Sequence, residues 1–414
     1  MKGMLIAHSC RGLPFVAALA AVSAFALPNV EVTAFRQKGV TVEVEYSLSG
    51  GPAVVTVDFL TNGVTIGEAN YANATGDVNQ VVSKASGKIF WRTTDLWAGD
   101  KPATNCRAVV TAWATNAPPD YFVYDIETKE KRFYVSTNAL PLGGLTNRIY
   151  KTSRIVMRRI PAANVEWRMG SPFCETGRAA SEIPHLVTLT EDYYMAIFEM
   201  TQAQYANTGW SYAKGFSYTG EDADIHPAEM VNYWHIRGGT CVPVDGRTNP
   251  GSFIANLRAA SGVDFDLPTE AQWEFACRAG TSTALNSGKD LLAAANDANA
   301  KEVAWTQENA SEGQTVAATH AVGLKPPNAW GLYDMHGNVL EWCVDWWAEY
   351  APEDATDPAG GTASNGTRGR SLRGGGYGWH ASGGCRSASR TYDNGKGGMK
   401  DRGFRLICPV TLKW

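Results

Sequence analysis

The amino-acid sequence predicts an α+β domain preceded by an all-β sandwich. The first observation is a period-two alternation of apolar and polar residues in several short runs between Val30 and Thr137. The second is a change after Leu140–Gly144, beyond which helix-start signals stand among loops rich in glycine and tryptophan. The 414 residues include 42 glycines and 14 tryptophans, and 44% are hydrophobic. This composition indicates a packed globular protein with many irregular loops.

The N-terminal segment has the composition of a secretion signal. Lys2 and Arg11 precede the apolar run Leu13–Leu27, and Ala24-Phe25-Ala26 places small residues at the positions that a signal peptidase reads. A membrane span needs about 20 apolar residues, so this run is too short to be one. We therefore expect residues 1–26 to be a signal peptide, no membrane span, and a product that is secreted, periplasmic or at the cell surface.

Residues 27–140 are predicted to form the sandwich. Turn signals at Ser49–Gly51 and Thr61–Gly63 separate runs rich in valine, threonine and aromatic residues. The alternating runs are 30–35, 40–48, 53–60, 107–115 and 131–137. Several such strands in this length favour an antiparallel sandwich of immunoglobulin or fibronectin type. Because the segment contains no constellation of catalytic residues, we interpret it as a spacer or docking module.

A linker over residues 141–152 is predicted to lead into a C-terminal domain over residues 153–414. Arg154–Ile160 has the pattern of an entering strand. Further on, Thr269 and Gln272 have the spacing of a capping box, which predicts the start of a helix.

The segment Gly331–Trp347, GLYDMHGNVLEWCVDWW, concentrates acids and tryptophans around two glycines. Asp334, Asn338 and Glu341 fall within one tight turn, where their oxygens could close around a hard cation such as Ca²⁺. An alternative is that the acids cap turns while the tryptophans fill a core. The residues alone leave both interpretations open.

Eight segments fit the sequence pattern of a single protein family. They read MGSP (169–172), EIPHLVTLT (182–190), EMTQAQY (199–205), LPTEAQWEFACRAG (267–280), GLYDMHGNVLEW (331–342), RGGG (373–376), CRSASR (385–390) and RGFRL (402–406). In this order they resemble the sulfatase-modifying factor family, which includes the formylglycine-generating enzymes. The resemblance covers roughly residues 150–410. It implies the family's variant of the C-type lectin fold for the C-terminal domain.

The resemblance also implies a structural calcium site. Asp334, Gly337, Val339 and Glu341 match the positions where the family binds Ca²⁺, two through side-chain oxygens and two through backbone carbonyls. Asp334 replaces the asparagine that is more usual in the oxidases and keeps a hard oxygen donor. Such an ion would stabilise the loop.

The family's oxidases use a cysteine pair, five residues apart, that binds copper. The first cysteine position falls on Trp379, and counting on without a gap puts the second on Gly384. Tryptophan and glycine cannot ligate Cu(I) or exchange with a substrate thiol. We therefore do not expect copper or the known oxidase mechanism, and no other metal centre is indicated around the lone His380.

By resemblance, Cys277 and Cys385 occupy positions that look like a family disulfide, so we predict that they pair. Seven of the eight cysteines remain after the predicted signal peptide, and an odd number leaves at least one free thiol unless chains cross-link.

A surface formed by Gly374–Ser389 and Asp393–Arg402, on a glycine-rich frame, offers aromatic anchors and adaptable polar groups. Its candidate ligand-binding residues are Tyr377, Trp379, His380, Tyr392, Asn394 and Lys396. The alternative is a solvated loop without a ligand. The weakly acidic chain, with a formal net charge of −4, gives no electrostatic basis for binding nucleic acid.

Two classes of function follow for the C-terminal domain, beside a structural class in which the β module docks the protein on a cell-surface partner. The first is an exported family member that lacks the oxidase cysteine pair and binds a ligand, such as a protein or peptide, on its lectin-like domain. The second is a formylglycine-generating oxidase acting on a sulfatase cysteine, or another oxidoreductase using the same cleft. The sequence does not identify the ligand.

Overall fold

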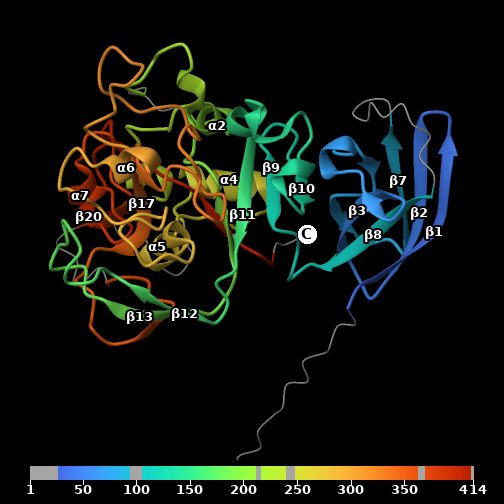
Figure 1. Cartoon of the computed structure of the whole chain (residues 1–414), viewed down its shortest axis with the longest axis horizontal. Helices are drawn as coiled ribbons and strands as arrows, with labels where there is room; N and C mark the ends of the chain where they lie inside the picture. Colours follow the sequence, from blue (N-terminus) through green and yellow to red (C-terminus); the bar gives the residue numbers. More distant parts are fainter. Residues whose placement is uncertain (1–26, 94–104, 211–215, 239–247, 362–368, 412–414) are drawn as a thin grey trace, which may run out of the picture.

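Figure 1 shows the computed structural model of the chain. It describes residues 27–93, 105–210, 216–238, 248–361 and 369–411. The predicted signal peptide, residues 1–26, and Cys241 lie outside these ranges. No helix in the described part is long and apolar enough to cross a membrane.

The N-terminal part contains two antiparallel sheets whose side chains share one core cluster. The strand order is β1–β2–β7–β5 in one sheet and β4–β3–β6 in the other, and β8 also pairs with β3. The bounds are β1 Asn29–Lys38, β2 Thr41–Ser49, β3 Ala53–Thr61, β4 Val64–Thr65, β5 Thr75–Gly76, β6 Gln80–Val82, β7 Ser86–Arg92 and β8 Cys106–Ala114.

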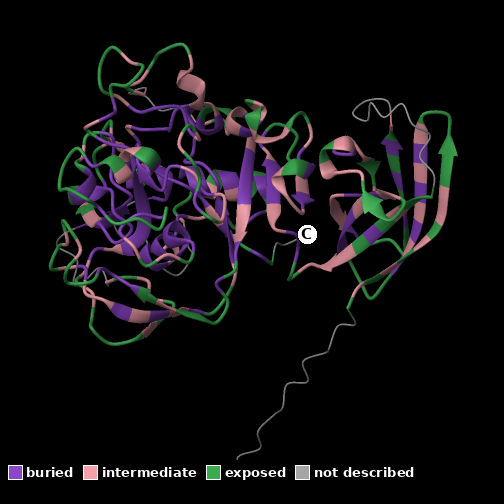
Figure 2. Ribbon diagram, viewed as in Figure 1, coloured by how far each residue is buried: buried purple, intermediate pink, exposed green. Residues whose placement is uncertain are grey.

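Strand β2 shows why this part forms sheets. Val42, Val44, Tyr46 and Leu48 are buried, whereas the residues between them are partly exposed. Because side chains alternate between the two faces of a strand, one face reaches the core and the other reaches water. Figure 2 shows this alternation as changing colours along the strands. The immunoglobulin or fibronectin type of this part stays a prediction.

A five-stranded sheet crosses the expected boundary at residue 140, with the order β10–β9–β11–β14–β22. Its bounds are β9 Tyr121–Asp125, β10 Lys131–Tyr134, β11 Arg154–Ile160, β14 Tyr193–Ala196 and β22 Ile407–Pro409. The run 131–137, which contains β10, was expected in the N-terminal module, and β9 was not predicted as a strand. Strand β10 pairs with β9, and β9 pairs with β11, the predicted entering strand. The expected linker, residues 141–152, contains the short helical segments η3 (Gly144–Thr146) and α1 (Ile149–Thr152), and η2 (Thr137–Ala139) precedes it.

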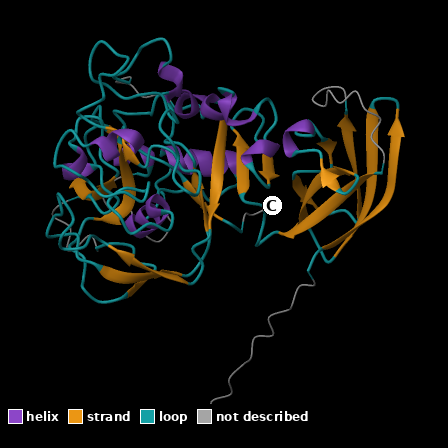
Figure 3. Cartoon of the chain, in the orientation of Figure 1, coloured by secondary structure: helices purple, strands orange, loops and turns teal. Residues whose placement is uncertain are grey.

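The rest of the C-terminal domain contains small sheets and short helices connected by long loops (Figure 3). The sheets are β12–β13–β18, β15–β16 and β20–β19–β17–β21. Their bounds are β12 Val165–Met169, β13 His185–Leu189, β15 Ala304–Trp305, β16 His336–Gly337, β17 Leu340–Trp346, β18 Ala355–Thr356, β19 Arg370–Arg373, β20 Arg390–Asp393 and β21 Arg402–Gly403. The helices are α2 Gln202–Asn207, α3 Tyr233–Ile236, α4 Phe253–Ser261, α5 Glu270–Arg278, α6 Ala298–Val303 and α7 Ala381–Gly384. Mixed sheets with few helices agree with the expected α+β class.

Helix α5 begins where the capping box predicted it. The Thr269 hydroxyl accepts a hydrogen bond from the Gln272 N–H, and the Gln272 side chain accepts one from the Thr269 N–H. These reciprocal bonds satisfy donors that a helix start leaves open. The helix then buries Trp273 and Phe275.

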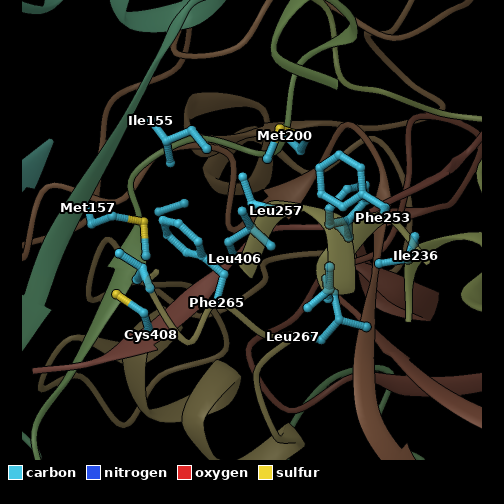
Figure 4. Packing of buried hydrophobic residues seen from close by; sticks show 14 of the residues in the cluster. Ile155, Met157, Met200, Ile236, Phe253, Leu257, Phe265, Leu267, Leu406 and Cys408 are labelled. Carbon is cyan, nitrogen blue, oxygen red and sulfur yellow. The ribbon is translucent and has the colours of Figure 1, made fainter. Parts of the chain in front are cut away.

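The domain core lies between the five-stranded sheet and the helices (Figure 4). Apolar side chains from β11, α3, α4 and the C-terminal segment meet there, among them Ile155, Met157, Ile236, Phe253, Leu257, Leu406 and Cys408. Val54 of β3 also belongs to this cluster, so the N-terminal part contributes directly to the core of the C-terminal domain.

The arginines of the family segments are internal rather than surface groups. Four of them have side chains exposed by 1% or less, and each pairs with a buried glutamate: Arg373 with Glu274, Arg386 with Glu182, Arg390 with Glu270 and Arg405 with Glu341. A buried charge is tolerated only when it is paired and hydrogen-bonded. These pairs connect segments far apart in the sequence and fix the loops that carry the candidate site.

Candidate functional site

The candidate site begins where β19 ends. Gly374 and Gly375 have φ values of 87° and 73°, and a Cβ on Gly375 would lie 2.6 Å from the Cys385 sulfur. Only glycine fits such a close approach without strain. The chain turns tightly here and returns through α7 towards Cys385.

The side chain of Trp379 lies directly against Gly384. A Cβ added to Gly384 would lie 2.7 Å from Trp379 Cε3. The indole Nε1–H donates a hydrogen bond to Asp401 Oδ2 at 3.1 Å, which fixes the ring. The two positions where the resemblance places the oxidase cysteines therefore face each other, but they hold an indole and the glycine beneath it. These residues do not fit copper.

The predicted disulfide between Cys277 and Cys385 is wrong, because both are free and buried thiols. The Cys277 sulfur instead contacts Ser387 Oγ and His336 Nε2, each at 3.8 Å. Burial raises the pKa of both Cys277 and Cys385 to about 12. At neutral pH these thiols are protonated and unreactive.

The two acidic calcium candidates have different surroundings. Glu341 is saturated, because its oxygens accept bonds from Arg405 Nε and Nη2 and from Trp273 Nε1 at 2.6–3.0 Å. Asp334 uses only Oδ2, which accepts the Gly323 N–H at 2.7 Å. Its buried Oδ1 has no hydrogen-bond partner.

Three carboxyl groups, those of Glu199, Asp334 and Glu341, lie close enough around this turn to influence one another. Burial raises the pKa of Asp334 to about 6, while burial and repulsion by Asp334 and Glu341 raise the pKa of Glu199 well above its usual value. In the described part of the chain, no group of three or more His, Cys, Asp or Glu side chains could hold a metal. An ion here would therefore also need the carbonyls of Gly337 and Val339. The orphaned Asp334 oxygen fits a hard cation such as Ca²⁺.

The first three candidate ligand-binding residues differ in exposure. Tyr377 is only 5% exposed, and burial, with Asp401 and Glu229 nearby, raises its pKa to about 12. Trp379 is half-buried in its contact with Gly384. His380 is exposed, and its Nδ1 lies 2.7 Å from Glu308 Oε1.

The other three lie on or after β20. Tyr392 is 40% exposed, and its ring centre lies 5.0 Å from that of Trp347. Asn394 and Lys396 share one turn, in which Asn394 Oδ1 accepts the Lys396 N–H. The structure therefore groups Asn394 with Lys396 and places both Tyr377 and Trp379 near Asp401, whereas His380 and Tyr392 contact other segments.

Three residues at this surface were not among the six candidates named from the sequence. Trp234 lies under the Lys396 ammonium, Met399 is 48% exposed, and Asp401 holds the indole of Trp379. Trp234 comes from α3, far from Lys396 in sequence, so only the tertiary fold brings them together. Met399 and Asp401 lie inside the expected stretch Asp393–Arg402, shortly before the RGFRL segment, and this position was the only available signal for them.

Comparison with known proteins gives one family match. The family described as "Sulfatase-modifying factor enzyme 1-like domain" matches residues 156–410. The formylglycine-generating enzyme of Mus musculus is 34% identical over 145 residues, covering 34% of this chain and 38% of that enzyme. The formylglycine-generating enzyme of Thermomonospora curvata is 34% identical over 152 residues, covering 34% and 48%. Each match spans less than half of the enzyme's length.

Two solved structures are also similar. Treponema denticola variable protein 1 is 26% identical with a TM-score of 0.48, covering 62% of this chain and 95% of that one. PvdO from Pseudomonas aeruginosa is 25% identical with a TM-score of 0.46, covering 62% and 94%.

Proposed function

The chain belongs to the sulfatase-modifying factor enzyme 1-like family, whose model matches residues 156–410, and we propose that this member binds a ligand instead of oxidising a cysteine. The observation that carries the proposal is the contact between Trp379 and Gly384. An indole and a glycine supply no thiolate for copper and no sulfur for exchange with a substrate.

Among the described residues, the remaining thiols do not replace the missing pair. Cys277 and Cys385 are buried, and their pKa values near 12 keep them protonated. Cys106 and Cys174 are exposed but free. These observations favour a member without oxidase activity.

A copper and thiol assay tests the absence of oxidase activity. The purified chain, without the predicted signal peptide, is titrated with Cu(I) and incubated aerobically with a peptide that carries a sulfatase-type cysteine. We expect no stoichiometric Cu(I) binding and full retention of the peptide thiol. The double variant Trp379→Cys, Gly384→Cys is the matched control, and its new thiol pair should bind Cu(I). Stoichiometric copper binding with loss of the peptide thiol in the unaltered chain would overturn the proposal.

The surface around Tyr377, Trp379, Asn394 and Lys396 supports ligand binding. Rigid aromatic rings give contact area at a low entropy cost, and neighbouring polar groups give specificity. The glycine turns and the indole bond to Asp401 hold this surface in one arrangement. We propose a protein or peptide ligand, met outside the cytoplasm because of the signal-like residues 1–26.

We also propose a structural calcium ion held by Asp334, by the carbonyls of Gly337 and Val339, and by Glu341, which would give up a hydrogen bond from Arg405 or Trp273 to bind the ion. Its support is the buried, unpartnered Asp334 Oδ1, which lies close to the carboxyl groups of Glu199 and Glu341. Added Ca²⁺ should raise Tm by roughly 3 °C or more over the chelated protein. Asp334→Ala should abolish this rise, whereas Asp354→Ala, at an exposed position, should keep it. An unaltered Tm on chelation in the parent protein would contradict the proposal.

A further inference from the structure

Aromatic and basic side chains gather beside the candidate site in an arrangement that identifies a ligand class. We call the group Trp234, Tyr377, Lys396, Met399 and Lys400 the lysine–aromatic patch. The Lys396 ammonium lies 5.4 Å from the centre of the Trp234 ring, and the Lys400 ammonium lies 5.9 Å from that of Tyr377. Trp234 is 37% exposed and Met399 is 48% exposed. The patch therefore exposes both apolar area and ammonium groups to solvent.

The backbone connects the members of the patch. The Met230 N–H donates to the Met399 carbonyl at 3.0 Å, and Asn232 Nδ2 donates to the Lys396 carbonyl at 2.9 Å. A Cβ on Gly395 would lie 3.1 Å from Tyr233 Cβ. The segment preceding Trp234 is thus packed directly against the segment that carries both lysines.

The turn that presents Lys396 is held before any ligand arrives. Gly395 N–H donates to Asp393 Oδ1 at 2.9 Å, and Lys396 N–H donates to Asn394 Oδ1 at 3.0 Å. Gly395 has a φ of 76°, which a glycine adopts without strain. A preorganised turn loses little entropy on binding, so more of the contact energy contributes to affinity.

The neighbouring carboxylates do not neutralise the two lysines. Arg402 Nη1 pairs with Asp393 Oδ2 at 2.8 Å, and Asp401 Oδ2 accepts the indole N–H of Trp379. Glu229 is fully buried and accepts the backbone N–H groups of Ser217 and Tyr218. Within the described part of the chain, neither Lys396 nor Lys400 forms an ion pair. The patch consequently presents two ammonium groups that no carboxylate of the described residues pairs with directly.

We infer that the lysine–aromatic patch binds an acidic peptide segment that also carries an apolar side chain. Carboxylates of the peptide would pair with Lys396 and Lys400, and the apolar side chain would pack between Trp234 and Met399. Complementary charge gives such a surface selectivity for its partner as well as faster association. This inference rests on the proposed ligand-binding function and assigns the chemical class of the ligand.

Three synthetic peptides test the inference on the exported chain. Each has 12 residues, a fluorescent label, and one Phe and one Leu; the remaining positions alternate Gly with Glu, Gln or Lys. Fluorescence anisotropy at about 50 mM salt should show the Glu peptide binding at least about tenfold more tightly than the Gln peptide. Raising the salt to about 0.5 M should weaken this preference, because exposed charges are screened.

Variants locate the binding surface. The double variant Lys396→Gln, Lys400→Gln should weaken binding of the Glu peptide about tenfold. Trp234→Ala should weaken the binding of all three peptides. Lys289→Gln is the matched control, because Lys289 is an exposed lysine that pairs with Glu302 outside the patch. It should leave binding unaltered.

The outcomes separate the two proposals. If the Gln or Lys peptide binds as tightly as the Glu peptide, or if the double lysine variant keeps full affinity, the acidic-ligand inference fails while ligand binding itself stands. If no peptide binds, both the inference and the proposed binding of peptides fail. The copper and thiol assay alone decides whether the chain is an oxidase.

Discussion

At the scale of single residues, the position of Trp379 depends on the glycine beneath it. Gly384→Ala should lower the free energy of unfolding by about 1–3 kcal/mol. The new methyl group would lie 2.7 Å from the indole and would push the ring away from Asp401. Urea unfolding measures the difference.

The adjacent Gly383 provides the control for that prediction. A Cβ at Gly383 meets nothing within 4 Å, and the residue lies in the same short helix, α7. Gly383→Ala should therefore be neutral or slightly stabilising. Equal destabilisation by both substitutions would show that the indole contact is not responsible.

The buried His226 should make the folded protein less stable in mild acid. Burial lowers its pKa from 6.5 to about 4, while its ring stacks on Tyr218 at 3.7 Å and contacts Thr319 Oγ1 at 3.1 Å. The unfolded state therefore binds the proton more readily. Stability from this group is complete above about pH 6.5 and is lost as the pH falls towards 4, by at most about 3 kcal/mol.

Urea unfolding at several pH values measures that loss. His226→Gln should be less stable at pH 7, but its stability should fall less steeply between pH 6.5 and 4 than that of the parent protein. The same slope in both proteins would contradict the assignment to His226.

The sequence identified part of the site at this scale. The resemblance placed Trp379 and Gly384 at paired positions, and the structure puts them in contact. The sequence did not show that Arg405 saturates Glu341, or that Trp234 lies beneath Lys396. These contacts join segments far apart in the chain, and no local pattern records them.

At the scale of elements, helix α5 depends on its capping box. Thr269→Ala removes the hydroxyl that accepts the Gln272 N–H at 3.1 Å, so the free energy of unfolding should fall by about 1 kcal/mol. Thr269→Ser keeps the hydroxyl and should retain most of the stability. Chemical denaturation of both variants checks this, and an equal loss in both would instead implicate the threonine methyl group.

Local sequence signals predicted where the elements lie better than they predicted which strands pair with each other. The capping box located α5 and the alternation located β2, because both are set by hydrogen bonds or burial within a few residues. Strand β10 was also located correctly, within the run 131–137, but was expected in the N-terminal module. Its pairing with β9, and that of β9 with β11, depends on distant segments.

At the scale of the whole molecule, strand β3 connects two cores. Val54 and Val55 are both fully buried, and as successive residues of a strand they point to opposite faces. Val55 packs in the N-terminal core, whereas Val54 belongs to the cluster of Phe122 and Phe133. The run AVVTVDFL could have indicated a strand buried on both faces, but not which neighbour covers the second face.

This shared strand predicts that the two parts of the chain unfold together. Calorimetry of the parent protein should show one cooperative transition, because separating the parts would expose Val54 and its neighbours to water. Val54→Asp puts a charge into the shared core and should divide the transition in two, since the carboxylate would be buried without a partner. Val40→Asp makes the same change at a valine that is 43% exposed, and should keep one transition. Two transitions in the parent protein would mean that the contact through Val54 is too weak to couple the parts.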